Sequence, residues 1–188
     1  MFAINQLCAL VRPGLSVTTE DLLDRMLDDT IKLGTSTPRA DPSGDYAWDL
    51  FRKAEMIRPG SFSALERKAL QLVGGPDAPT TPPGRILPYG MLLTDGRADM
   101  FLTYCTNAND ALRENPGFSK VSLPHPLAVG ASYGLTVLNN ASAAAYRFAM
   151  YVLSADGQRV LAKFGFFTPT LLLSKPLICH GMSAPGES

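Results

Sequence analysis

The residues best suited to binding chemistry in this sequence form a short turn, Asp41-Pro42-Ser43-Gly44-Asp45, between an apolar run and a predicted helix. A helix N-terminus carries unpaired backbone N–H groups and a partial positive charge, so it favours oxyanions. Ser43 adds a hydroxyl donor, and Gly44 lets a ligand approach the backbone closely. Asp and Ser before a helix are also ordinary capping residues, and Asp45 would repel an anion. The turn therefore fits either an anion site or a simple cap.

A second candidate is Tyr104, at the end of the predicted strand from Met100 to Tyr104. The carboxyl edge of a sheet is where α/β proteins bind ligands, and a neutral phenol can donate a hydrogen bond to an anion. The alternative is an amphipathic tyrosine at a domain boundary.

The remaining reactive residues give weaker signals. The cysteines and histidines are Cys8, Cys105, Cys179, His125 and His180, and none has metal-ligand spacing. Cys8 lies in an apolar run, which predicts a free thiol in the core. Cys105 follows Tyr104 and is a candidate nucleophile, but no motif places a histidine or an acid to activate it. We therefore expect neither a metal site nor an enzyme.

Strands and helices alternate along the chain, which predicts an α/β fold with mainly parallel strands. The predicted strands are 7–11, 31–34, 100–104, 120–123 and 133–138. The predicted helices are 18–26, one beginning at Asp45, 61–72, 89–94, 141–153 and 157–164. Residues 74–84 are rich in Pro and Gly and predict a loop. The end of the chain after Pro169 has no clear period, and we expect it to be partly disordered.

Composition narrows the class of protein. Lys plus Arg and Asp plus Glu are 17 each, so the net charge is zero, which argues against a nucleic-acid partner. The sequence contains no run of 18 apolar residues, so no membrane-spanning helix is predicted. The first residues, MFAINQLCALVRPG, lack the basic and apolar regions of an export signal, so none is predicted in the sequence as given.

Four segments together resemble the periplasmic molybdate- and tungstate-binding proteins, the substrate-binding components of ABC transporters. They are Phe2-Ala3-x-Asn5-x-Leu7, the turn from Asp41 to Tyr46, Gly96-x-Ala-Asp99 with Tyr104, and Leu153-Ser-x-x-Gly-Gln158 with Phe164-Gly-Phe166. The resemblance covers residues 2–169. The last segment is shared by many binding proteins of this broad class, whereas its combination with the turn and the Tyr104 strand is more specific.

The resemblance implies a type 2 periplasmic binding protein fold, with one complete lobe and part of a second. Residues 8–104 would form the complete lobe, residues 1–7 and 105–169 a remnant of the first lobe, and 170–188 a tail. It implies a tetrahedral oxyanion, molybdate or tungstate, as ligand and no cofactor. By position, the ligand-binding residues would be Ser43, Gly44, Tyr104 and, through a backbone donor, Ile86. It further implies periplasmic localisation and ABC transporter membrane subunits as partners.

Several alternatives remain open at this stage. Part of the family's first lobe, with two serine-bearing loops, has no counterpart in this sequence. The chain is therefore also consistent with a truncated, non-binding fragment, or with a small-anion sensor or binding module of the same fold. An apolar lobe face left uncovered would favour self-association.

Overall fold

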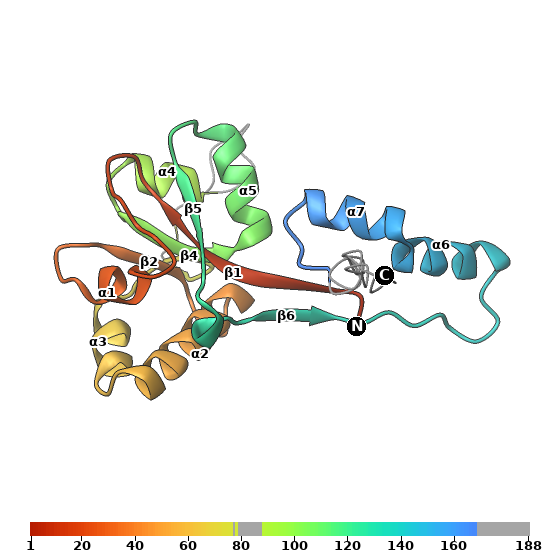
Figure 1. The fold of residues 1–188 in the computed structure, drawn as a ribbon, viewed down its shortest axis with the longest axis horizontal. Helices are drawn as coiled ribbons and strands as arrows, with labels where there is room; N and C mark the ends of the chain where they lie inside the picture. Colours follow the sequence, from red (N-terminus) through yellow and green to blue (C-terminus); the bar gives the residue numbers. More distant parts are fainter. Residues whose placement is uncertain (77, 79–87, 169–188) are drawn as a thin grey trace, which may run out of the picture.

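A mixed sheet with helices on both faces forms the larger part of the protein (Figure 1). The computed structural model describes residues 1–76, 78 and 88–168. The strand order is β3-β2-β4-β1-β5, and β6 pairs with the first half of β1. The strands are β1 (Ala3–Val11), β2 (Leu33–Ser36), β3 (Leu70–Val73), β4 (Met100–Tyr104), β5 (Ser119–Ser122) and β6 (Gly130–Tyr133).

Alternation along β1 explains the two-sided core. Leu7, Ala9 and Val11 belong to one buried cluster, and the intervening Cys8 and Leu10 belong to the other, because successive strand residues point to opposite faces. Helices α1 (Leu22–Leu27), α2 (Pro42–Ile57) and α3 (Ser61–Lys68) contribute to the first cluster. Helices α4 (Tyr89–Thr94) and α5 (Cys105–Glu114) contribute to the second. The sheet is thus the middle layer of three.

The expectation of mainly parallel strands is met in the direction of five of the six described strands, but it is wrong for the pairings that β1 makes. β2 is parallel to β3 and β4, but β1 is antiparallel to β4, β5 and β6. The helices between the predicted strands suggested crossover connections throughout. Strand β1 instead comes first in the chain and is inserted in the opposite direction between β4 and β5.

Several helices and strands begin or end at other residues than the sequence predicts, because strand pairing or helix capping outweighs the local sequence pattern. The helix predicted over 61–72 ends at Lys68, and Leu70–Val73 becomes a strand because it pairs with β2. Helix α2 begins at Pro42 rather than Asp45, and β2 lies two residues later than expected. Helix α5 was not predicted. The strand expected over 133–138 is β6, which ends at Tyr133. The predicted helix 89–94 and strand 100–104 are confirmed.

A second, sparsely packed part contains helices α6 (Ala143–Leu153) and α7 (Ala155–Lys163). In Figure 1 these helices lie apart from the sheet, at the far end of the ribbon formed by β1 and β6. Among the described residues, no hydrophobic side chain after Leu127 is buried. This part therefore has no closed core of its own. No helix in the described ranges is long and apolar enough to cross a bilayer.

Candidate functional site

Adjacent parallel strands bring the two predicted site elements to one edge of the sheet. β2 and β4 are paired in parallel, with Thr35 opposite Leu102, so their carboxyl ends lie together. β2 leads into the turn before α2, and β4 ends at Tyr104, immediately before α5. Two helix N-termini therefore begin at this edge, and Tyr104 lies between the sheet and one of them.

Ser43 is fully buried in the first turn of α2, and its donors already have partners. Its backbone N–H donates to the Asp41 carboxylate at 2.9 Å. Its Oγ lies 2.9 Å from the same carboxylate oxygen and 2.8 Å from Ser36 Oγ. In this structure the turn is a complete N-cap, and the N–H expected to reach a ligand is bonded to Asp41.

Gly44 is required by the backbone packed against it. A Cβ at this position would lie 2.6 Å from the carbonyl carbon of Thr37 and 2.7 Å from the carbonyl oxygen of Ser36. The glycine therefore lets α2 begin directly against the end of β2. Its geometry explains the close packing of helix and strand without requiring a ligand.

A second carboxylate is also engaged within the turn. Asp45 accepts a hydrogen bond from the backbone N–H of Arg39 at 2.9 Å, and Arg39 has a positive φ of 67°. Asp41 and Asp45 thus both bind backbone groups of the loop they belong to. Any anion at this turn would meet two carboxylates.

Tyr104 is partly buried, and its ring centre lies 6.1 Å from that of Tyr46 in an edge-on arrangement. Burial raises the pKa of Tyr104 well above its usual value, and the neighbouring Tyr133, Tyr46 and Asp41 act in the same direction. The phenol therefore remains protonated and neutral. It is a hydrogen-bond donor of the kind expected for an oxyanion site.

A largely buried polar cluster, which the sequence did not predict, lies at the carboxyl ends of β2 and β4. Asn107 Nδ2 donates to Tyr89 Oη at 3.2 Å and lies 3.3 Å from Thr103 Oγ1. Burial raises the pKa of Tyr89, while hydrogen bonds with Thr103, Ser36 and Asn107 oppose that shift. The available signal was the change from apolar to hydroxyl residues at the ends of β2 and β4, Ser36 and Thr103. The cluster joins both strand ends to α4 and α5.

The prediction that Cys8 is a free thiol is wrong. Cys8 forms a disulfide with Cys105, and the Cα atoms of the two residues are 5.0 Å apart. A bonded Cys105 offers no thiolate, so the nucleophile alternative fails. Cys8 is buried as expected, but it is not free. Within the described ranges, no group of three His, Cys, Asp or Glu side chains is placed to hold a metal ion. Ile86 lies outside the described residues.

The sequence profile of the bacterial extracellular solute-binding proteins matches residues 1–167, and the chain belongs to that family. An uncharacterized protein of Pasteurella multocida (strain Pm70) is 36% identical over 167 residues, covering 88% of this chain and 67% of its own length.

Two solved structures share the fold at low identity. A substrate-binding domain attributed to a molybdenum ABC transporter of Clostridium difficile has a TM-score of 0.64 at 18% identity, over 88% of this chain and 64% of that one. The sulfate-binding protein SubI of Mycobacterium tuberculosis H37Rv has a TM-score of 0.62 at 16% identity, over 92% and 60%. The predicted type 2 periplasmic binding protein fold is confirmed, and the family is shown as that of the bacterial extracellular solute-binding proteins. The chain spans about two thirds of the length of these relatives.

Proposed function

We propose that the chain acts in an ABC importer as part of the substrate-binding component for a tetrahedral oxyanion of the molybdate or tungstate type. The observation that carries this proposal is the meeting of Tyr104 and the α2 N-terminus at the carboxyl ends of two adjacent parallel strands. The proposed ligand-binding residues are Ser43, Gly44 and Tyr104, together with a backbone donor at Ile86. The solute-binding family supports a role in binding rather than in catalysis.

The hydrogen bonds of Ser43 favour a second candidate, a chain that does not bind an oxyanion by itself. The Asp41 carboxylate already accepts from the backbone N–H and lies 2.9 Å from the hydroxyl. An oxyanion would have to displace it, and an incompletely satisfied buried anion is costly. A small-anion module that prefers another ligand would face the same carboxylate.

Thermal unfolding with molybdate, tungstate and sulfate separates these candidates. At a hundred times its dissociation constant, a ligand that binds only the folded state stabilises it by about 2.7 kcal/mol. We expect the unfolding temperature to rise with molybdate and tungstate, and less with sulfate. No rise with any oxyanion at millimolar concentration would establish the non-binding alternative for this chain.

Tyr104→Phe then tests the site itself. The loss of one phenol donor to an anion should weaken binding by about 1.5–3 kcal/mol, or roughly ten- to a hundredfold. The matched control is Tyr146→Phe, because Tyr146 is 51% exposed on α6. Equal affinities of the two variants would remove Tyr104 from the site.

The family resemblance predicts a complete lobe formed by residues 8–104, with residues 1–7 and 105–169 as part of the first lobe. The contacts of α5 and β5 favour a later boundary, because α5 packs against β1 and β5 pairs with it. We propose that the partial lobe begins after Leu127, where the buried hydrophobic residues end within the described part of the chain.

Location and partners follow from the same proposal. A disulfide between buried cysteines persists in oxidising compartments, which supports a place outside the cytoplasm. There the chain would dock on ABC transporter membrane subunits, and its zero net charge makes a nucleic-acid partner unfavourable. Self-association is proposed through the α6 side that carries Tyr146, Met150 and Leu153, which lie at helical spacing and are 51%, 66% and 42% exposed.

A further inference from the structure

Helix α5 begins with an open N-terminus at the same sheet edge as the proposed site. It has ten residues and follows Tyr104 directly. No side chain in the described part of the chain caps its first turn, and that turn contains no acidic residue. The backbone N–H groups of Cys105, Thr106 and Asn107 have no preceding helical carbonyl to bond. The α5 end therefore keeps its donors, whereas the α2 end has bonded one to Asp41.

Asn5 is a buried polar side chain directed at this open helix end. Leu7 of β1 pairs with Tyr104, so Asn5 lies two residues beyond the end of β4, beside the start of α5. Its Nδ2 donates to Thr106 Oγ1 at 3.0 Å. The residue is only 6% exposed, and its Oδ1 has no hydrogen-bond partner among the described residues. A buried amide is normally bonded at both ends, by protein, water or a ligand, so stability alone does not explain Asn5 here.

The pair formed by Asn5 and Thr106 has one hydrogen-bond donor too many. In the structure Thr106 Oγ1 accepts from Asn5, so the hydroxyl hydrogen has no acceptor within the described ranges. After a half-turn of the amide, the hydroxyl would donate to Oδ1, and the amino group would take the position that lacks a partner. Either arrangement needs a further acceptor. Thr106 is partly exposed, so an acceptor can reach the pair from outside.

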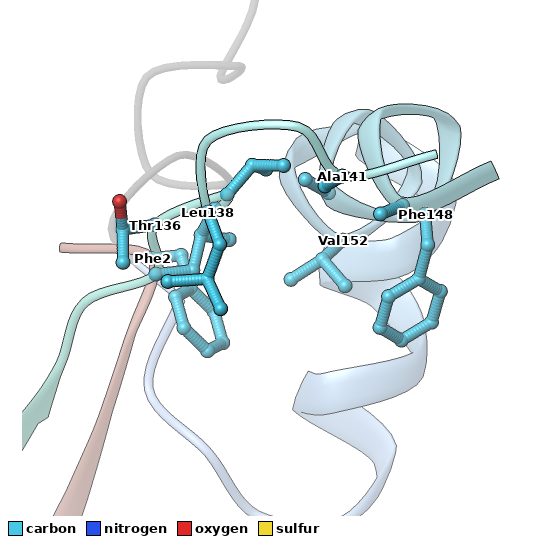
Figure 2. Close-up of a pocket in the computed structure, with 10 residues that line it drawn as sticks. Phe2, Thr136, Leu138, Ala141, Phe148 and Val152 are labelled. Atoms are coloured by element: carbon cyan, nitrogen blue, oxygen red, sulfur yellow. The ribbon is translucent and has the colours of Figure 1, made fainter. Parts of the chain in front are cut away.

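The apolar groove beside α6 offers no comparable donors (Figure 2). Figure 2 shows Phe2 and Leu138 on one side of this groove, and Val152 and Phe148 of α6 on the other. Thr136 is the one lining residue with a polar side chain. An anion placed there would lose water without gaining hydrogen bonds, which is unfavourable. The groove is therefore not an alternative place for the oxyanion.

We infer that the oxyanion lies on the N-terminus of α5, where it accepts hydrogen bonds from the Thr106 hydroxyl and from the first-turn backbone N–H groups. Tyr104, the residue before this helix, supplies the phenol donor already proposed. Asn5 is a positioning residue, because it acts on the anion through Thr106. This placement rests on the proposed oxyanion function and removes its main obstacle, since the Asp41 cap of α2 stays in place.

Amide NMR of the full chain, titrated with molybdate, distinguishes the two helix ends. We expect the backbone N–H signals of Thr106 and Asn107 to shift as molybdate is added, because these groups bond the anion. The signals of Ser43 and Gly44 should shift less. Shifts confined to Ser43 and Gly44 would overturn the α5 site and leave the proposed oxyanion function intact. No shift at either end up to millimolar molybdate would reject both.

Thr106→Val keeps the shape of the side chain and removes its hydroxyl. Molybdate affinity, measured by isothermal titration, should fall about tenfold, as expected for the loss of one hydrogen bond to a charged group. The matched control is Thr94→Val, because the Thr94 hydroxyl donates to the Gly90 carbonyl within α4. Equal affinities of the two variants would remove Thr106 from the site.

Asn5→Leu separates a positioning role from a structural one. Leucine has a similar volume and eliminates the unpaired oxygen, so the unfolding temperature without ligand should stay the same or rise. Molybdate affinity should nevertheless fall severalfold, because Thr106 Oγ1 loses the donor that orients it. A lower unfolding temperature with unchanged affinity would show that Asn5 serves only the fold.

Discussion

Asp41 separates the two interpretations of the turn before α2, because its carboxylate binds the group that an oxyanion would need. It accepts from the Ser43 backbone N–H, and its charge acts on Tyr104. A cap and an anion site are therefore not independent here. The same N–H serves one partner or the other.

Replacing Asp41 by asparagine keeps a capping side chain and removes the negative charge. A unit charge about 4 Å away in water contributes about 1 kcal/mol, so oxyanion affinity should rise about fivefold. Isothermal titration of Asp41→Asn against the parent chain measures this change. Asp49→Asn is the control, since Asp49 pairs with Arg52 and both side chains are more than half exposed. Weaker binding by Asp41→Asn would instead make the carboxylate part of the ligand site.

At the level of elements, Asp99 joins three strands where β1 ends and β2 and β4 begin. Its carboxylate binds Arg12 at 2.6 Å and the Lys32 backbone N–H at 2.8 Å. Burial alone would raise the pKa of Asp99, but the Lys32 hydrogen bond and the Arg12 guanidinium together lower it. A lowered pKa means that the folded state favours the charged carboxylate. This stability is present above the unfolded-state pKa and is lost as pH falls through the folded-state pKa.

Asp99→Asn should therefore destabilise the chain at neutral pH, by about 1 kcal/mol because Arg12 is partly exposed. The difference from the parent chain should shrink as pH falls through the acidic range. Urea unfolding at neutral and acidic pH measures both effects. Asp110→Asn, which loses an exposed pair with Arg113 on α5, should change little at either pH. A difference independent of pH would show that Asp99 acts through packing alone.

The elements also show what local sequence patterns can predict. The predicted strand Met100–Tyr104 is correct, because an apolar run follows Gly96, the glycine predicted to end the preceding helix. Leu70–Val73 and the antiparallel insertion of β1 depend on partners distant in the chain, so no local pattern reports them. The family resemblance alone predicts that Ser43 and Tyr104 belong to one site, and the pairing of β2 with β4 brings both to the same edge of the sheet. The cap formed by Asp41 was also expected, but its direct bond to the proposed ligand donor was not.

For the whole molecule, the Cys8–Cys105 disulfide joins β1 to α5 on one face of the sheet and links residues 97 positions apart in the sequence. Cross-linking such a distance typically adds about 2–4 kcal/mol of stability. Cys8→Ala with Cys105→Ala should lower the free energy of unfolding by that amount, measured by urea unfolding without reductant. Cys179→Ser should have no such effect. Thiol titration of the unfolded parent chain should find one free thiol, and three would show that the disulfide had not formed.

β1 belongs to both parts of the molecule, so its two halves should differ in how well their amide hydrogens are protected from exchange with water. Its second half lies between β4 and β5 in the buried sheet, whereas its first half pairs with β6 beside helices that have no buried core. The first half can open without disturbing the second, because local opening costs least where few apolar contacts are lost. A melting temperature would consequently report the sheet and its strand-end site. The outer end of the same strand would exchange its amide hydrogens long before that transition.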